Sequence, residues 1–351
     1  MSSQLVIQTA FLGDLILSIP LLKKIKQRFP DDQLILVCKS GLGEFFLKEK
    51  IVDQVFEIKK NDRDSYNSAI QQLNQKNIDN IFCVHRSLRS QLMSLKVKAR
   101  RKIAFHSFVG RFIFNDLIEF KKSWPEALRQ LNILTSIDQS VSALLKKQDW
   151  SYLNHPNEHG HLPQVPKDLQ VPWMSKIEKA GSKKVALFPG SVWATKKWTA
   201  EGFVQVGQYF LKNGFQVFLM GGPDEKEICL QIQKQCPQAQ VIAGALSIAR
   251  SIEFIRDCAL VIANDSAPTH MAACQDVPVV SVFGPTTLAM GFRPWSSNAM
   301  IVENNNLNCR PCGKHGHQQC PLGHHKCMKD IEASRVIEAS LQLLKTSSNN
   351  L

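Results

Sequence analysis

Long uninterrupted apolar runs are missing from this sequence of 351 residues, and no stretch approaches the length that a membrane-spanning helix needs. The apolar N-terminus lacks early Lys or Arg and is broken by Gly13-Asp14, unlike a secretory signal peptide. Both absences argue against an integral membrane or exported protein. We therefore expect a cytoplasmic chain whose mature form starts at Met1.

Signatures of nucleic-acid and dinucleotide binding are missing as well. The first strand-to-helix turn contains Gly13 but no Gly-x-Gly-x-x-Gly fingerprint. Acidic residues are relatively few, with 30 Asp and Glu against 43 Lys and Arg, and the net charge of +13 favours anionic partners. The densest basic cluster, Lys96–Lys102, is also explained as a solvated helix end. Because no nucleic-acid-binding motif accompanies it, we expect no nucleic-acid partner.

Strand and helix patterns alternate along most of the chain. They run from residues 4–8 to 87–98 and restart at 184–188, which predicts mostly parallel sheets. The length suffices for two cores, and the stretch 154–173, rich in Pro and His, is the best linker candidate. We predict an α/β fold with two Rossmann-like, doubly wound domains, 1–170 and 171–351, facing a cleft. In the helical pattern of residues 15–28, Pro20 predicts a kink.

Small polar residues follow two apolar strand patterns of the second domain. Asp265-Ser266-Ala267 comes after the run 259–262, and Gly284-Pro285-Thr286 comes after the run 279–283. Asp265 or Ser266 could simply cap the helix that begins near Pro268. Alternatively, this strand end and helix start hold a phosphate. Since ligands of open α/β sheets bind at the carboxyl ends of strands, two such turns together favour a ligand site.

Three further turns carry candidate groups. Gly190-Ser191-Val192 precedes Lys196, and this turn either holds a diphosphate or is a solvated loop. Glu225 and Glu227 follow the next strand, where they could meet a ribose or only complement a helix dipole. Asp14 lies at a helix N-terminus, as a cap or as a general base for a hydroxyl.

The ten cysteines fall into two groups. Six are scattered through apolar or helical stretches and are predicted to be core thiols. The other four form Cys309-x2-Cys312-x7-Cys320-x6-Cys327, with several histidines among them. A CxxC pair with two further cysteines is typical of tetrahedral zinc, although the second pair lacks tight spacing. Disulfides and packed thiols are the alternatives.

In their order along the chain, these motifs resemble glycosyltransferase family 9, the bacterial heptosyltransferases of lipopolysaccharide core synthesis. The Cys-rich segment 309–327 is similar to one in the heptosyltransferase II branch. The resemblance implies the GT-B arrangement and inverting transfer of L-glycero-D-manno-heptose from ADP-heptose to the lipopolysaccharide inner core. The residues that carry it are Gly13-Asp14, Pro20, Pro189-Gly190, Lys196, Trp198, Asn264-Asp265-Ser266, His270 and Phe283-Gly284-Pro285-Thr286.

The resemblance also implies roles for the site residues. Asp14 would be the catalytic base, Lys196 would contact the donor phosphates, and Asp265 would hold the heptose hydroxyls. A further set would bind the rest of the donor: Ser191, Val192, Ser266, Ala267, His270, and Glu225 or Glu227 at the ribose. Related enzymes often have a hydroxyl residue where this chain has Val192.

The resemblance implies ADP-heptose and a lipid A-core acceptor as partners. It requires no cofactor, and a structural zinc ion at the four cysteines is the one metal we consider. We expect peripheral contact with the anionic inner face of the inner membrane. Rival hypotheses are another nucleotide-sugar glycosyltransferase, a GT-B-like epimerase that needs no acceptor, and a zinc-stabilised nucleic-acid-binding protein with salt-sensitive binding.

Overall fold

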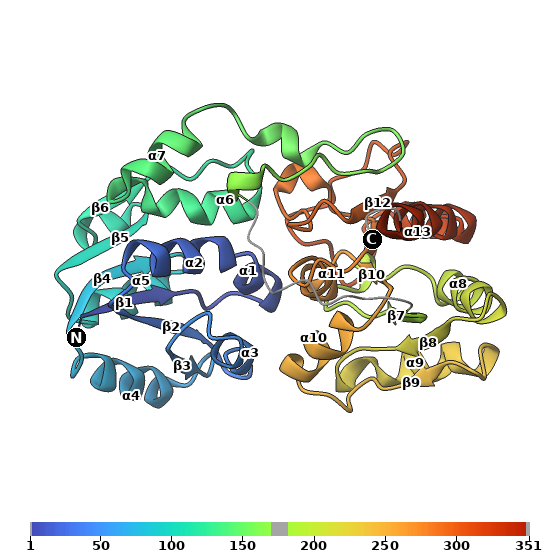
Figure 1. Ribbon diagram of the computed structural model, residues 1–351, viewed down its shortest axis with the longest axis horizontal. Helices are drawn as coiled ribbons and strands as arrows, with labels where there is room; N and C mark the ends of the chain where they lie inside the picture. The colour runs from blue at the N-terminus through green and yellow to red at the C-terminus, as the bar shows by residue number, and fades with distance from the viewer. Residues whose placement is uncertain (1, 170–181, 349–351) are drawn as a thin grey trace. The chain divides into compact units, whose positions relative to one another are not determined.

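The chain folds into two compact α/β units, Met1–Trp150 and Ser151–Leu351. The computed structural model describes residues 2–169 and 182–348 (Figure 1). The division comes earlier in the chain than the boundary predicted at 170. The reason is that residues 151–169 pack with the second unit, where the Arg293 side chain donates to the carbonyl oxygens of Leu153 and Pro163. The predicted linker therefore belongs to the second unit up to residue 169, and residues 170–181 lie outside the described part.

The first unit contains a parallel six-stranded sheet with the order β3-β2-β1-β4-β5-β6. Its central strands β1, β2 and β4 are rich in Ile, Leu and Val and are almost fully buried, as is typical of doubly wound sheets, whereas the edge strands β3 and β6 are only partly buried. The chain moves outward in both directions from β1 and β4, so the topological switch lies between these two strands. The strand bounds are β1 Ser3–Ile7, β2 Gln33–Lys39, β3 Gln54–Ile58, β4 Ile78–Cys83, β5 Arg101–Phe105 and β6 Asp116–Ile118.

Two helices, rather than one kinked helix, occupy the predicted pattern of residues 15–28. They are α1 (Leu12–Ile16) and α2 (Ile19–Arg28), and Pro20 lies in the first turn of α2. Proline has no N–H to donate, and the first turn of a helix needs none, so Pro20 fits a helix start. The other helices of this unit are α3 Glu44–Lys48, α4 Arg63–Leu73, α5 Leu88–Lys96, α6 Glu126–Leu131 and α7 Gln139–Leu145.

The second unit repeats the architecture, with the parallel order β12-β11-β10-β7-β8-β9. Thr199 caps α8 (Ala200–Lys212), since its hydroxyl oxygen accepts from the Gly202 N–H at 3.1 Å. Helix α13 (Ala333–Ser348) packs on α8, β11 and β12 of its own unit. The remaining bounds are β7 Lys184–Phe188, β8 Gln216–Leu219, α9 Lys226–Gln235, β9 Gln240–Val241, α10 Ile248–Arg256, β10 Leu260–Asn264, α11 Ala267–Ala273, β11 Val279–Phe283, β12 Ala299–Glu303 and α12 Lys326–Lys329.

In the part of the chain that the structure describes, no helix combines the length and apolarity that crossing a bilayer requires.

Candidate functional site

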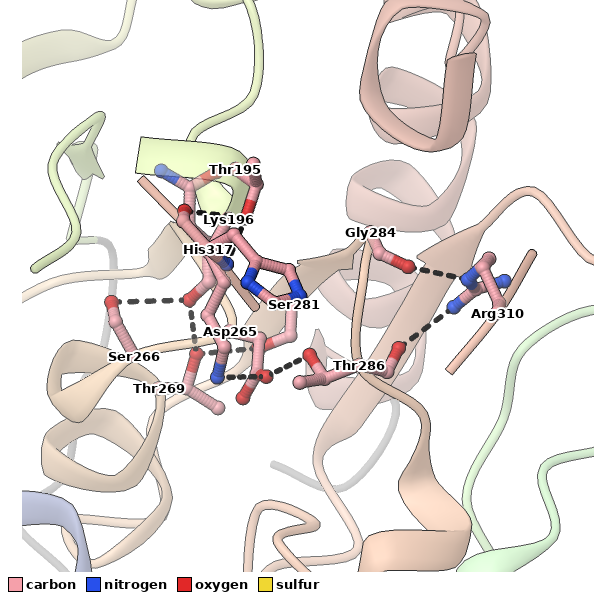
Figure 2. A network of polar contacts seen from close by, with 11 residues as sticks. Thr195, Lys196, Asp265, Ser266, Thr269, Ser281, Gly284, Thr286, Arg310 and His317 are labelled. Atoms are coloured by element: carbon pink, nitrogen blue, oxygen red, sulfur yellow. Dashed lines mark hydrogen bonds and ion pairs between the residues drawn. The ribbon is translucent and has the colours of Figure 1, made fainter. Parts of the chain in front are cut away.

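The turns after β7, β10 and β11, three neighbouring strands, meet at the Asp265 carboxylate (Figure 2). Lys196 Nζ lies 2.6 Å from Asp265 Oδ2, and Thr286 Oγ1 donates to the same oxygen at 2.5 Å. The Lys196 and Asp265 side chains are only 14% and 6% exposed. Burial strengthens charge-assisted hydrogen bonds of this kind, because water competes less for the same atoms. The structure thus brings together the predicted phosphate-contacting lysine and the predicted sugar-binding acid.

Asn264, whose role the sequence did not predict, joins β10 to the turn after β7. Its Oδ1 accepts from the Trp198 N–H at 2.9 Å, and its Nδ2 donates to the carbonyl oxygens of Pro189 (2.9 Å) and Gly190 (3.2 Å). The residue is completely buried. An amide at the end of an otherwise apolar strand was the available signal. Asn264 holds the two turns at one fixed spacing.

The capping interpretation of Asp265 and Ser266 is wrong. Ser266 occupies the N-cap position of α11, but its side chain makes no cap hydrogen bond and donates instead to the Asn264 carbonyl oxygen at 3.3 Å. The Asp265 carboxylate is occupied by Lys196 and Thr286. Behind them, Thr269 Oγ1 contacts Ser281 Oγ at 2.5 Å. The side chains of Asp265 and Ser266 therefore belong to a polar network at the strand ends and do not cap α11.

His270, on α11, is a buried neutral imidazole beside this network. The His270 pKa is lowered to about 4; burial is the largest cause, Asp265 opposes the shift, and the charge of Lys196 adds to it. Its Nδ1 has no hydrogen-bond partner among the residues described. Since a buried polar atom without a partner is costly, this nitrogen is available to a ligand group.

The structure separates the two acids that the sequence left as alternatives. Glu225 Oε2 accepts from the Gly222 N–H at 2.5 Å, and the Glu225 side chain lies so close to Gly190 that a Cβ there would collide with it. Glu227 is exposed on α9, 3.5 Å from Gln231. Glu225 is therefore the acid that lies at the strand-end edge.

Ser191 and Val192 differ sharply in exposure. Ser191 is buried, whereas the Val192 side chain is 68% exposed. The Val192 carbonyl oxygen accepts from Gln318 Nε2 at 3.1 Å, so the backbone of this turn is tied to the Cys-rich segment. Of the two predicted donor contacts, Ser191 lies inside the turn and Val192 presents its side chain to solvent.

In the first unit, Asp14 lies in the first turn of α1 and does not cap it, because Phe11 occupies the N-cap position. The Asp14 carbonyl oxygen accepts from Gln130 Nε2 at 3.1 Å. The same Nε2 donates to Glu126 Oε1 at 3.0 Å, and Glu126 contacts Arg129 at 2.8 Å. Gln130 therefore links the turn that carries Asp14 to a buried ion pair on α6.

Glu126 and Arg129, which the sequence interpretation missed, change the electrostatics around Asp14. The Glu126 pKa is raised to about 7; burial is the largest cause, Arg129 opposes the shift, and the charge of Asp14 adds to it. A second carboxyl group thus lies within electrostatic range of the predicted base. Its sequence signal was a Glu and an Arg three positions apart in an apolar helical stretch.

Another polar chain lies at the ends of β1 and β4. Thr9 Oγ1 lies 2.8 Å from His85 Nδ1 and 2.9 Å from Ser90 Oγ. These two strands flank the topological switch, which is where open α/β sheets bind ligands. The first unit therefore presents polar groups at the expected edge.

Comparison with known proteins identifies the family. A family model described as glycosyltransferase family 9 (heptosyltransferase) matches residues 66–324. This chain belongs to that family. Lipooligosaccharide heptosyltransferase 2 of Campylobacter jejuni is 28% identical over 353 residues, covering 96% of this chain and 97% of the relative. Lipopolysaccharide heptosyltransferase 2 of Salmonella typhimurium is 22% identical, with coverages of 97% and 98%.

Solved structures share the fold. E. coli ADP-heptose lipopolysaccharide heptosyltransferase II matches with a TM-score of 0.75 at 19% identity, covering 99% of each chain. A family 9 glycosyltransferase from Veillonella parvula matches with a TM-score of 0.76 at 21% identity, covering 98% of this chain and 97% of its own. The predicted GT-B fold, the family and the glycosyltransferase class are confirmed, which disfavours the rival epimerase and nucleic-acid-binding hypotheses.

In this family 9 glycosyltransferase, the Cys-rich segment braces the turns of the site. Thr195 Oγ1 donates to the His317 carbonyl oxygen at 2.8 Å, and the Thr195 carbonyl accepts from His325 Nε2 at 2.8 Å. Arg310 donates to the carbonyl oxygens of Gly284 and Thr286, as Figure 2 shows. The segment therefore holds the turns after β7 and β11 from outside the sheet.

The structure does not assemble the predicted zinc site. Cys309, Cys312, Cys320 and Cys327 are free thiols, and the described residues contain no group of three or more His, Cys, Asp or Glu side chains arranged to hold a metal ion. The Cys327 pKa is raised to about 11, mainly by burial and also by the other three thiols. Zinc binding stays a prediction, and no step below depends on it.

Proposed function

We propose that this chain transfers L-glycero-D-manno-heptose from ADP-heptose to the lipopolysaccharide inner core on lipid A, with inversion at the anomeric carbon. The observation that carries the proposal is the buried contact of Lys196, Asp265 and Thr286 at three adjacent strand ends. It combines a fixed positive charge with an acid and a hydroxyl, the groups that an anionic nucleotide sugar needs. The names of the Campylobacter and Salmonella relatives support the choice of heptose.

On the donor side, we assign Lys196 to the diphosphate. Negative charge grows on ADP as the bond to the anomeric carbon breaks, and a pre-positioned ammonium stabilises it without reorganisation. Asp265 accepts hydrogen bonds from the heptose hydroxyls. Ser191, Ser266, Ala267 and His270 line the nucleotide and phosphate pocket, Val192 contributes through its backbone, and Glu225, in preference to Glu227, binds the ribose.

On the acceptor side, we assign Asp14 as the general base. The acceptor hydroxyl oxygen attacks the anomeric carbon, its proton passes to the Asp14 carboxylate, and the carbon–oxygen bond to the diphosphate breaks to release ADP. A single displacement from the opposite face inverts the configuration. This scheme requires no cofactor. The lipid-linked acceptor implies that the enzyme works at the inner face of the inner membrane.

A donor screen tests the proposal. ADP-heptose, other ADP-sugars and UDP-sugars are each incubated with truncated core acceptors, and the linkage in the product is determined. We expect product only from ADP-heptose with a heptose or inner-core acceptor. A preference for a UDP-sugar would overturn the donor assignment. Incubation with donor alone is the second arm, because formation of an isomerised sugar without acceptor would indicate an epimerase.

A further inference from the structure

An exposed apolar surface occupies one part of the first unit, on helix α5 and the short 3-10 helix η1 (Val109–Phe112). We call it the α5–η1 patch. Phe108 and Phe112 are 75% and 80% exposed, which is unusual for rings of this size. The apolar members of the patch are Leu88, Leu92, Leu95, Phe108, Val109 and Phe112.

These side chains form one continuous surface. Leu88, Leu92 and Leu95 are spaced by four and three residues, so they lie on one face of α5. Helix α5 packs against η1, and Ser107 Oγ donates to Gln91 Oε1 at 3.0 Å. The Phe108 and Phe112 rings contact each other edge to face, with centroids 6.4 Å apart. The apolar face of α5 therefore continues onto the two exposed rings.

The patch lies in the most one-sided charge environment of the sequence. Residues 80–115 contain no Asp or Glu. Arg89 and Lys96 are exposed on α5, and the exposed Arg111 places its guanidinium 5.8 Å from the centre of the Phe108 ring. The Lys and Arg residues of this range are Arg86, Arg89, Lys96, Lys98, Arg100, Arg101, Lys102 and Arg111, of which Arg100 and Arg101 form ion pairs with the bordering acids Asp79 and Asp116.

We propose that the α5–η1 patch docks this enzyme on an anionic lipid bilayer. Phe108 and Phe112 enter the headgroup region, and Arg89, Lys96 and Arg111 contact lipid phosphates. Exposed aromatic and leucine side chains bordered by basic residues are typical of surfaces that lie on membranes. A second copy of the chain is a poor occupant, since two patches of the same charge repel each other.

Vesicle sedimentation of the full chain tests the docking surface without any sugar present. The probes are vesicles of phosphatidylglycerol and phosphatidylcholine, compared with phosphatidylcholine alone. We expect binding to the anionic vesicles that weakens as salt is raised. Phe108→Ser with Phe112→Ser should lower binding by about tenfold or more, because two rings no longer leave water. The matched control changes Leu230→Ser and Leu322→Ser, exposed apolar residues of the second unit, and should bind like wild type.

A charge test uses the same assay. Arg89→Glu with Lys96→Glu should reduce binding to anionic vesicles strongly, whereas Lys212→Glu with Lys234→Glu makes the same charge change on exposed lysines of the second unit and should reduce it much less. Equal losses of vesicle binding from the two pairs of substitutions would show that net charge alone drives binding and would overturn the proposed docking surface. Unchanged binding by the phenylalanine variant would overturn it too.

Two further measurements separate this proposal from other occupants. Sedimentation velocity should give the same oligomeric state for wild type and the Phe108→Ser/Phe112→Ser variant, and loss of a dimer would assign the patch to a second copy instead. Transfer to a detergent-free truncated acceptor should be unchanged in that variant. Reduced transfer there would place the rings in acceptor binding and overturn the membrane role. Because vesicles contain no donor or acceptor, failure of vesicle binding leaves the proposed transfer reaction untouched.

Discussion

The two units contain the same doubly wound sheet, but the acids at their strand ends have opposite kinds of neighbour. In the second unit, Asp265 is buried against Lys196 and Thr286, so its charge is balanced at short range. In the first unit, Asp14 lies near Glu126, a second and deeply buried carboxyl group. A neighbouring acid disfavours the charged form, whereas a neighbouring lysine favours it. We call the Asp265 side the fixed-charge edge, after its contact with Lys196, and the Asp14 side the proton-exchanging edge, after the general base proposed there.

Changing Asp14 tests the proton-exchanging edge and has the largest expected effect. Asp14→Asn should lower the transfer rate by about 10²–10⁴-fold, the usual contribution of a general base, while ADP affinity stays nearly unchanged. Steady-state kinetics and ADP titration measure the two quantities. Asp31→Asn, at an exposed turn of the same unit, is the matched control. Substantial turnover by Asp14→Asn would show that Asp14 is not the general base.

Changing Lys196 tests the fixed-charge edge. Lys196→Met leaves the Asp265 carboxylate buried without its cation, and breaking such a pair costs about 3–5 kcal/mol of unfolding free energy. We also expect weaker ADP binding. Urea unfolding and ADP titration measure both effects, with Lys197→Met, an exposed neighbour, as control.

A second variant tests whether the unpaired Asp265 charge causes the stability loss of Lys196→Met. Adding Asp265→Asn to Lys196→Met removes the unpaired charge and should recover much of the lost stability. If the double variant is as unstable as Lys196→Met, the buried ion pair is not what stabilises this edge.

The two units should respond to pH in opposite directions. The Glu126 pKa is raised from 4.5 to about 7, so the folded state holds that proton better. Protonated Glu126 stabilises the folded state fully below pH 4.5, and this contribution is lost as pH rises through 7. The His270 pKa is lowered from 6.5 to about 4, so the unfolded state binds the proton better. Neutral His270 therefore contributes its full stability above pH 6.5, and this contribution is lost as pH falls through 4.

Two variants measure this contrast. Relative to wild type, Glu126→Gln should gain stability as pH rises from 4.5 to 7, and His270→Asn should gain stability as pH falls from 6.5 to 4. Each slope is bounded at about 1.4 kcal/mol per pH unit, the value for one proton. Unfolding free energies at several pH values give the slopes. Parallel slopes for the two variants would contradict the comparison.

The smallest expected effect concerns the hydroxyl at Asp265. Thr286→Val removes one hydrogen bond to the carboxylate and should cost about 1–3 kcal/mol, as for a bond to a charged group. We expect a matching rise in KM for the donor. Thr287→Val changes the adjacent residue, whose side chain makes no cap bond to the 3-10 helix that follows it. Equal effects of the two variants would show that Thr286 does not act through Asp265.

Particular residues show how far sequence reasoning reached. The strand Lys184–Phe188 was predicted with its observed bounds, because a short apolar run between polar turns leaves little choice. Pro20 was assigned to a kink, because the amphipathic pattern does not reveal that α1 ends at Ile16 and that a new helix begins at Ile19. Asp14, Lys196 and Asp265 were selected as candidates because each follows a strand pattern and matches a motif of the family. Glu126 was missed, because it is distant in sequence, and Asn264 and Thr286 were named as motif residues without their contacts, because contacts across strands do not show in a local pattern.

The sequence by itself determined the alternation of strands and helices, the family and the strand-end positions of the candidate acids, since these depend on local pattern and motif order. Only the tertiary structure decided what each acid contacts: a lysine 69 positions away for Asp265, and for Asp14 a turn that Gln130, 116 positions away, links to Glu126. It also decided that, among the described residues, Arg310, His317 and His325 of the Cys-rich segment contact the turns after β7 and β11. Charge balance and burial depend on neighbours in space, and sheet packing chooses those neighbours.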